Sequence, residues 1–415
     1  MSSLLLLALI YFAFISLGLP DGVVGVAWPA MRQSLAQPVE AAGLITLVVT
    51  ACSALSGFAS GAVLKRFSAG VVVTASGFAT GLALLAFAFV PSFAMLLLLC
   101  VPLGLGAGAV DAAMNHFVAR HYSSSHMNWL HGCWGLGATL GPVVMGWALA
   151  AQATAGGNWR LGYQLIGVLQ LGLAVLFLLS LRLWQRAPEV VQVDAPRHGD
   201  MVRKSDEVGE PGAIGDERRV DMSAAATTPA PIPALAQWLA PFLFFLYAAV
   251  EVGTSLWSAT VLIEQRHFSA ATASLWVSCF FGAIMGGRFA TGLISQRLGN
   301  RKLVRYGLMI AIAGALLFGL PDLPRWLSLA GLILLGLGCA PVYPSLMHEA
   351  ARRFDAPTAQ RVIGHQVGSA YLGCMFVPAA LGLIGATWGL WLIVPLIAVC
   401  AGLLLWFSKL LDQMT

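Results

Sequence analysis

Long runs of apolar residues, separated by short polar breaks, recur along nearly the whole chain. Most runs reach about 20 residues, the length of α-helix that crosses a hydrocarbon core of about 30 Å. Marking the runs and their breaks predicts twelve membrane helices, at 4–29, 40–63, 69–90, 93–118, 127–150, 159–184, 236–262, 270–295, 303–320, 325–350, 359–386 and 388–410. The pattern therefore predicts an all-α membrane protein.

The segment 185–233 interrupts this pattern. It has no aromatic residue, it carries many charges of both signs, and it ends in the Pro-rich stretch TTPAPIP. Such a composition offers no core to bury, so we interpret the segment as a flexible cytoplasmic linker. It divides the chain into a first six-helix half at 1–184 and a second at 234–415.

The two halves match when they are aligned at an offset near 231 residues. The stretch 56–61 (SGFASG) then faces 287–292 (GRFATG), and 103–106 (LGLG) faces 335–338 (LGLG). Internal repeats of this kind are typical of transporter folds, in which the substrate site lies between the repeats near the bilayer midplane.

This arrangement resembles the major facilitator superfamily over the whole chain. The usual loop signature of that family is Gly-x-x-x-Asp-Arg-x-Gly-Arg-Arg or Lys, and it is matched by GAVLKRFSAG from Gly61 and by GLISQRLGNRK from Gly292. Lys65 and Gln296 stand where the signature has its acid. The resemblance implies the fold and alternating access, but it does not imply a charge-relay gate on these two loops.

Composition excludes several other classes of protein. Hydrophobic residues make up 59% of the chain and charged residues 10%, whereas soluble domains carry about 25% charged residues. The seven cysteines fall inside apolar runs, so they indicate neither disulfides nor metal spacing. No hydrolase, nucleotide-binding or metal-site signature appears, so we expect no enzyme activity, no cofactor and no metal.

The distribution of Lys and Arg predicts the orientation. If both termini are cytoplasmic, eighteen of the 23 Lys and Arg residues fall on the inner side and four on the outer side, while Arg288 lies inside a helix. Cytoplasmic loops carry such an excess. We therefore expect a monomeric, multi-pass protein of the cell inner (plasma) membrane. Because topology accounts for the basic residues, we expect no nucleic-acid partner.

Three acidic residues, Asp21, Asp111 and Glu251, lie within predicted membrane helices. An acid at the centre of such a helix costs about 2.5–3.5 kcal/mol, so it faces a cavity or a partner. A buried ion pair is the structural alternative for each acid. Arg288 is the single basic residue away from the ends of the predicted spans, however, and it cannot neutralise all three. We predict that the three carboxylates carry proton coupling.

In the fourth predicted helix, one face carries Gly104, Gly108, Asp111 and Asn115, at steps of four, three and four residues. Small residues let a neighbouring helix approach, and the polar pair then points into the remaining space. Ordinary helix packing is the alternative explanation for the glycines. We expect Asp111 to be essential for coupling and Asn115 to contact the substrate.

Two clusters resemble the fucose permease branch of the superfamily: GLPDGVVGVAWP at 18–29 and GLGAGAVDAAMN at 104–115. In that branch the first helix carries a protonatable Asp, and the fourth carries an acid followed by Ala-Ala-Asn-Pro. By resemblance, Asp21 matches the first acid, Asp111 the second, and Asn115 the Asn. The resemblance implies a symporter in which the two acids couple sugar binding to protonation.

Other substrate contacts are expected on helices 5, 7, 10 and 11. Where the fucose permease branch has a Gln and an Asn on helix 5, this chain has His131 and Trp134. Trp134 would stack on a pyranose or select a flat or apolar substrate, while His131 has packing as an equal alternative. The second half adds Tyr247, Tyr343 beside a proline break, Gln366 and Ser369. Packing alone explains Gln366 and Ser369 equally well.

The sequence around Asp21 favours a bend in the first helix. Asp21 follows Pro20, which cannot donate a backbone hydrogen bond, and it is flanked by Gly22 and Gly25. We expect the helix to open there toward a central cavity. Because desolvation disfavours a charged carboxyl group, we predict that Asp21 is the proton carrier of the first half.

These features predict a secondary active transporter that imports a small polar metabolite, such as a sugar, by proton-coupled symport. Sodium stays open as the coupling ion. A proton-driven efflux antiporter of drugs or metabolites is the main alternative, because carboxylates in a cavity serve antiport as well as symport. A non-transporting receptor or a lipid-moving protein is a further alternative.

Overall fold

The computed structural model describes residues 2–122, 124–151, 158–184, 233–321 and 323–415. All but the last residue of the predicted linker at 185–233 lies outside them, so the division into halves joined by this linker stays a prediction. Within the described ranges the regular elements are helical, and twelve spans are long and apolar enough to cross a membrane. The predicted all-α membrane fold is confirmed.

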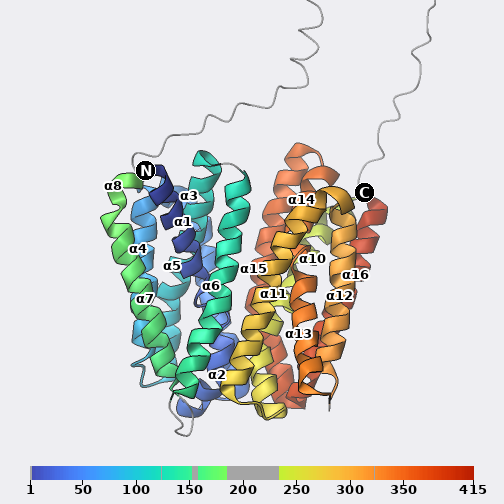
Figure 1. Ribbon diagram of the computed structural model, residues 1–415. Coiled ribbons are helices and arrows are strands. Elements are labelled where there is room, and N and C mark those ends of the chain that lie inside the picture. The colour runs from blue at the N-terminus through green and yellow to red at the C-terminus, as the bar shows by residue number, and fades with distance from the viewer. Residues whose placement is uncertain (1, 123, 152–157, 185–232, 322) are drawn as a thin grey trace, which may run out of the picture.

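The helices form two bundles that stand side by side (Figure 1). The first bundle contains α1 (Ser2–Gly18), α2 (Val23–Ser34), the 3-10 turn η1 (Val39–Ala41), α3 (Ala42–Leu64), α4 (Ala69–Phe87), α5 (Phe93–His121), α6 (Ser124–Ala150), α7 (Trp159–Leu179) and α8 (Leu181–Trp184). The second contains α10 (Ala234–Thr260), the π-helical turn η2 (Val261–Gln265), α11 (Ala270–Leu298), α12 (Asn300–Gly319), α13 (Arg325–Cys339), α14 (Val342–Arg353), α15 (Ala356–Trp388), the 3-10 turn η3 (Leu390–Leu392) and α16 (Ile393–Met414). We call the end where α1 begins and α16 ends the terminal end.

The first predicted helix is two helices rather than one bent helix. Residues 19–22 form a turn between α1 and α2, and Gly22 has a left-handed backbone with φ 73°. A Cβ atom at Gly22 would lie 2.4 Å from the Phe281 ring of the other bundle. Glycine is therefore required here twice, by backbone conformation and by close packing. The break places Asp21 outside regular helix.

The tenth predicted helix is also broken, as its proline predicted. α13 ends at Cys339 and α14 begins at Val342, just after Pro341. The hydroxyl group of Tyr247 donates a hydrogen bond to the Cys339 carbonyl at 3.3 Å. A side chain from α10 thus satisfies a backbone group that the proline break leaves without a helical partner.

The bundles close against each other at the end opposite the termini. A Cβ atom at Gly43 of α3 would lie 2.4 Å from Ala379 of α15, and one at Gly25 would lie 2.6 Å from the Ser255 carbonyl. An ion pair joins the bundles at this same end, with Arg32 Nη2 2.7 Å from Glu264 Oε1.

At the terminal end the same faces of α3 and α15 part. Gly61 lies five turns from Gly43 on one face of α3, and Gly368 lies three turns from Ala379 on one face of α15. Among the described residues, a Cβ atom at Gly61 or Gly368 would have nothing within 4 Å. The space between the bundles is therefore open toward the terminal end.

Breaking the Arg32–Glu264 pair will loosen the closed end. Both side chains are partly exposed, so the pair is worth about 1 kcal/mol or less. We expect Glu264→Gln to raise the ratio of open to closed forms at this end by about two- to fivefold. Spin labels at Leu44 and Leu383, which both line the surface there, report the change in distance by electron resonance.

The matched control is Glu40→Gln. Glu40 lies at the same end and takes part in no ion pair within the residues that the structure describes. If both variants change the spin-label distance equally, the loss of a negative charge, rather than the loss of the Arg32–Glu264 contact, moves the bundles.

Candidate functional site

The three membrane-embedded acids gather in the space between the bundles. Asp21 lies in the α1–α2 break, Asp111 on α5 and Glu251 on α10. The Asp21 carboxylate interacts electrostatically with both other carboxylates. Asp21 is exposed, whereas Asp111 and Glu251 are half-buried. The fold thus brings together acids that are far apart in the sequence.

Trp134 holds the Asp21 carboxylate from α6. The indole Nε1 donates a hydrogen bond to Asp21 Oδ2 at 2.8 Å. α1 and α6 can approach closely because Gly18 lacks a side chain: a Cβ atom there would lie 2.1 Å from the Trp134 carbonyl oxygen. The predicted role of Trp134 in stacking on substrate stays a prediction, and its polar edge is already engaged by Asp21.

Arg288 of α11 joins Trp134 to Glu251. Its guanidinium carbon lies 5.3 Å from the centre of the Trp134 ring, a cation–π distance. Its Nη2 lies 3.4 Å from Glu251 Oε1. A continuous row of four polar side chains therefore crosses from the first bundle to the second: Asp21, Trp134, Arg288 and Glu251. We call it the inter-bundle row.

The ion pairs of the structure bear on the structural alternative that the sequence left open for each acid. The structural ion pair is present at Glu251, which contacts Arg288. Within the described ranges, neither Asp21 nor Asp111 has an ion-pair partner. For these two carboxylates, the part of the chain that the structure describes therefore supplies no compensating cation.

Asp111 faces the second bundle. It accepts a hydrogen bond from Asn115 Nδ2 at 3.0 Å, as their spacing on one helical face predicted. It also interacts electrostatically with Tyr343 and Tyr371 of the other bundle. Two tyrosine side chains, one from α14 and one from α15, thus lie opposite the Asp111–Asn115 pair.

The glycines on the same helix serve packing, which was the alternative explanation for them. A Cβ atom at Gly104 would lie 2.3 Å from the Val49 carbonyl oxygen, and one at Gly108 would lie 2.1 Å from the Ser53 carbonyl oxygen. The glycines therefore let α3 and α5 pack backbone to backbone, beside rather than inside the acidic site.

The other residues predicted to contact substrate differ in how deeply their side chains are buried and in whether they already have partners. Tyr247 is buried and bonded to Cys339, whereas Tyr343 is half-buried and packs edge-on against Phe244. His131 is exposed, lies edge-on to Phe14, and interacts electrostatically with Arg288.

Gln366 and Ser369 lie on α15. Ser369 is half-buried. Gln366 is only 2% exposed, and its Oε1 has no hydrogen-bond partner in the described part of the chain. A buried acceptor without a partner is costly, and the contact of this amide with substrate stays a prediction.

Two residues of this site were not assigned from the sequence, Arg288 and Tyr371. The signal for Arg288 was its isolation as a cation within an apolar helix, a kind of residue that marks functional sites in membranes. Its Nε atom is buried and has no hydrogen-bond partner in the part of the chain that the structure describes. Tyr371 carried no comparable signal, because a tyrosine in an apolar run is common.

A model of the family described as Major Facilitator Superfamily matches residues 10–347 and 239–412 of the chain. A probable hexose phosphate transport protein of Chlamydia pneumoniae is 31% identical over 164 residues, which are 37% of this chain and 35% of that protein. The glucose/mannose transporter GlcP of Bacillus subtilis is 26% identical over 246 residues, 58% of this chain and 54% of that protein. The matches thus span about a third to a half of these relatives.

Solved structures with the same fold cover nearly the whole chain. A bacterial homologue of the human lysosomal transporter Spinster, in an inward-facing and occupied conformation, has a TM-score of 0.76 at 14% identity and covers 99% of this chain and 97% of its own. A D-xylose-proton symporter has a TM-score of 0.74 at 13% identity, covering 98% of both chains. The E. coli fucose:proton symporter has a TM-score of 0.61 at 14% identity, covering 99% of both. At these identities the likeness shows the fold alone.

Proposed function

The chain belongs to the Major Facilitator Superfamily, and from this premise we propose that it imports a small uncharged sugar together with protons. The observation that carries the proposal is the inter-bundle row. It connects Asp21, for which the described residues provide no ion-pair partner, to the ion pair of the second bundle through Trp134 and Arg288. A change of charge at one end can therefore act on both bundles.

The proposed coupling is a competition for Arg288. While Asp21 is neutral, Arg288 stays with Glu251 and the row is balanced in charge. Once Asp21 loses its proton, two carboxylates compete for one guanidinium across the face of Trp134. Such a switch biases the two arrangements of the bundles differently, which is what coupling requires.

The charges of the site favour an uncharged sugar over a sugar phosphate. A phosphomonoester carries about −1.5 to −2 charge at pH 7. Away from the span ends, the described membrane spans, including the α1–α2 break, supply three carboxylates and one guanidinium, and that guanidinium is already paired. A phosphate group would enter a site of like charge, so we assign to this chain the unphosphorylated substrate class, as the name of GlcP indicates for that relative.

Sugar hydroxyl groups also match the hydrogen-bonding groups that the site leaves free. A hydroxyl both donates and accepts. It can accept from Arg288 Nε and donate to Gln366 Oε1, two of the four buried side-chain atoms that have no hydrogen-bond partner among the described residues. The Asp111–Asn115 pair and Tyr371 supply further polar groups across the same space.

The orientation that we propose places the terminal end in the cytoplasm of a cell inner membrane. The Lys and Arg residues of the helix ends gather there, as cytoplasmic loops require. The structure, which is closed at the opposite end, would then be the inward-facing state of an importer.

Proteoliposomes test this function with labelled glucose, xylose and fucose. An inward gradient of one pH unit supplies about 1.4 kcal/mol per proton, so one-proton symport allows about tenfold accumulation. We expect accumulation of at least one of these sugars, and we expect unlabelled glucose 6-phosphate in excess not to compete. Accumulation of glucose 6-phosphate would assign the chain to the phosphorylated class instead.

The same vesicles separate import from efflux. Gradient-driven loss of a preloaded solute would identify an antiporter. A lack of response by every solute would indicate a receptor or another protein that does not transport.

A further inference from the structure

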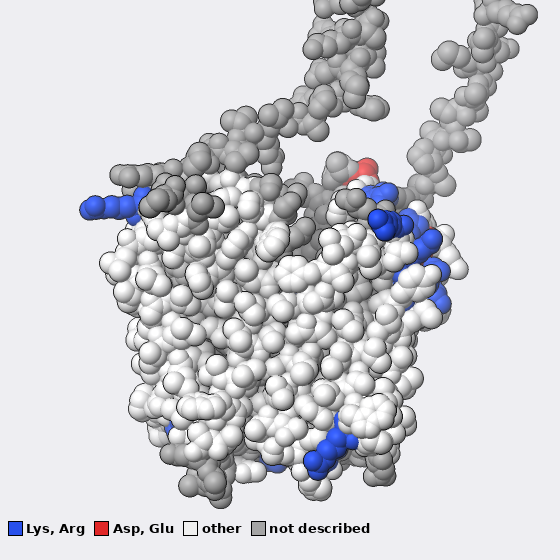
Figure 2. All heavy atoms as spheres, in the orientation of Figure 1, with Lys and Arg blue, Asp and Glu red and all other residues white. Residues whose placement is uncertain are grey.

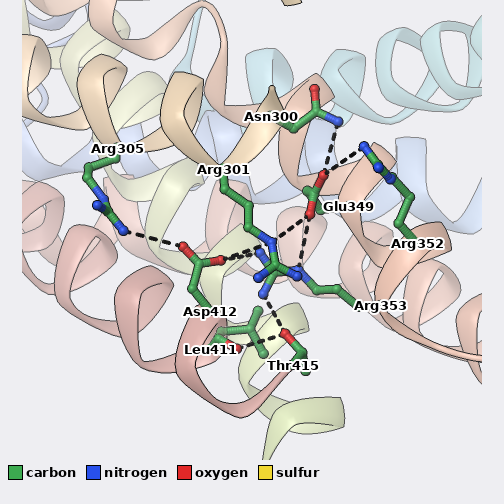
Figure 3. A network of polar contacts seen from close by, with 9 residues as sticks. All are labelled: Asn300, Arg301, Arg305, Glu349, Arg352, Arg353, Leu411, Asp412 and Thr415. Carbon is green, nitrogen blue, oxygen red and sulfur yellow. Dashed lines mark hydrogen bonds and ion pairs between the residues drawn. The ribbon is translucent and has the colours of Figure 1, made fainter. Parts of the chain in front are cut away.

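A charged network ties together the terminal ends of α12, α14 and α16 (Figure 3). Glu349 and Asp412 lie at its centre, with side chains 6% and 13% exposed. Around them stand four arginines: Arg301, Arg305, Arg352 and Arg353. Four guanidinium groups against two carboxylates leave the network with an excess of positive charge.

That excess lies on the surface. Arg353 is buried, is bonded to Thr415 at 2.8 Å and contacts both carboxylates. Arg305 and Arg352 are 47% and 67% exposed, and their nearest carboxylate oxygens among the described residues are 3.9 and 3.8 Å away. Within this part of the chain, both distances exceed normal hydrogen-bond distance, which leaves the two guanidinium groups able to bind another anion.

The first bundle shows that the fold does not require these charges. At an offset of 232 residues, Phe117, His121 and Ser180 occupy the positions of Glu349, Arg353 and Asp412. There the terminal end is held by ring contacts: Phe117 stacks on His121 at 4.2 Å and meets Trp184 edge-on at 5.1 Å. Equivalent helix ends are therefore held together by aromatic contacts in the first bundle and by ion pairs in the second.

On the exposed face of α12, basic residues near the terminal end are followed by apolar residues. The exposed residues of its first half are Arg301, Lys302, Arg305, Tyr306, Met309 and Ile310, while Leu303, Val304, Gly307 and Leu308 are buried. The exposed face is therefore basic up to Arg305, in the second turn, and carries Tyr306, Met309 and Ile310 after it. α16, which packs on α12, follows the same order with Lys409 and then Trp406, which is 59% exposed.

We propose that this face of α12 binds an anionic phospholipid of the inner leaflet, with Lys302 and Arg305 at the phosphate and Met309 and Ile310 along an acyl chain. Basic side chains gather on this side of the terminal end (Figure 2). Basic groups at the cytoplasmic ends of membrane helices attract anionic lipids. The apolar continuation fits a lipid, since a soluble phosphate or an acidic peptide would use only the basic residues. The site is independent of the transported solute.

Thermal unfolding in phosphatidylcholine nanodiscs with a rising fraction of phosphatidylglycerol tests the site. Since a ligand of the folded state stabilises it, wild-type protein should gain a saturable increase in Tm. Each basic group contributes about 1 kcal/mol, or about fivefold in affinity. We expect Lys302→Gln/Arg305→Gln to need about tenfold or more phosphatidylglycerol for the same increase, and Lys302→Gln alone about fivefold more should the double variant fail to fold.

The control is Lys65→Gln/Arg66→Gln, which removes the same charge from an exposed pair at the terminal end of the first bundle. It should respond as wild type does. Four results would overturn the proposal: no stabilisation of wild type, an unchanged response of the Lys302/Arg305 variants, an equal loss in the control, or full stabilisation by inorganic phosphate.

Discussion

Asp21→Asn will abolish proton-driven sugar accumulation and leave counterflow of the same sugar intact. The amide mimics the protonated carboxyl group in shape and neutrality, and it still accepts a hydrogen bond from the Trp134 indole that now binds Asp21. The variant can therefore bind sugar and move between its two states. It cannot release a proton, so the competition for Arg288 never begins.

We expect the variant to lose all of the sugar accumulation that depends on the proton gradient. Where wild type accumulates sugar about tenfold per pH unit, the variant should stop at equal concentrations on both sides. Counterflow, measured as exchange of labelled for unlabelled sugar without a gradient, should keep its wild-type rate within about twofold, which is a change below about 0.5 kcal/mol in the barrier.

Asp355→Asn is the matched control for that chemical change. Asp355 caps α15 by accepting a hydrogen bond from the Thr358 amide, a role that Asn fills equally well. It should transport as wild type does. Accumulation by Asp21→Asn at the wild-type level would show that the proton travels elsewhere. Loss of both counterflow and binding in a folded variant would make Asp21 a substrate ligand or a structural partner.

Arg288→Gln will destabilise the protein and stop transport. It leaves Glu251 as an uncompensated charge among helices. Losing one partner of a fully buried pair costs about 3–5 kcal/mol, but these side chains are 22% and 12% exposed, so we expect about 2 kcal/mol. Chemical denaturation of the purified protein in detergent measures this loss, and driven uptake measures the function.

The double variant Arg288→Gln/Glu251→Gln separates folding from coupling. Because it removes both charges, it should recover most of the lost stability while transport stays absent. A fully stable Arg288→Gln single variant would show that the ion pair contributes nothing to the fold. Normal driven uptake by the double variant would remove the pair from the coupling mechanism.

The twelve helices could be predicted because a membrane-spanning run is long and uninterrupted, and most predicted ends lie within a few residues of the observed ones. The first helix was the main departure. The apolar run resumes directly after Pro20–Gly22, so hydrophobicity alone could not locate the end of α1 at Gly18 or the restart at Val23. The close packing of the Phe281 ring against Gly22 is a contact between the two bundles, which the sequence does not show.

The three acids of the site could also be predicted from the sequence. A charge in an apolar run is conspicuous, so Asp21, Asp111 and Glu251 could be selected without a structure. Their partners could not, because pairing depends on which faces of α6 and α11 meet. The contact of Trp134 with Asp21 follows from the close approach at Gly18, and that of Arg288 with Glu251 from the packing of the second bundle.

Sugar-driven proton movement tests the central claim most directly. Proteoliposomes that contain a trapped pH indicator and start with no pH gradient are given an inward gradient of the sugar that the uptake assay identifies. Symport through the inter-bundle row predicts that the lumen becomes more acidic in wild type, and that the signal vanishes in Asp21→Asn although labelled sugar still exchanges. A lumen that becomes more alkaline as sugar enters, or that keeps its pH while wild-type protein takes up sugar, would contradict proton symport.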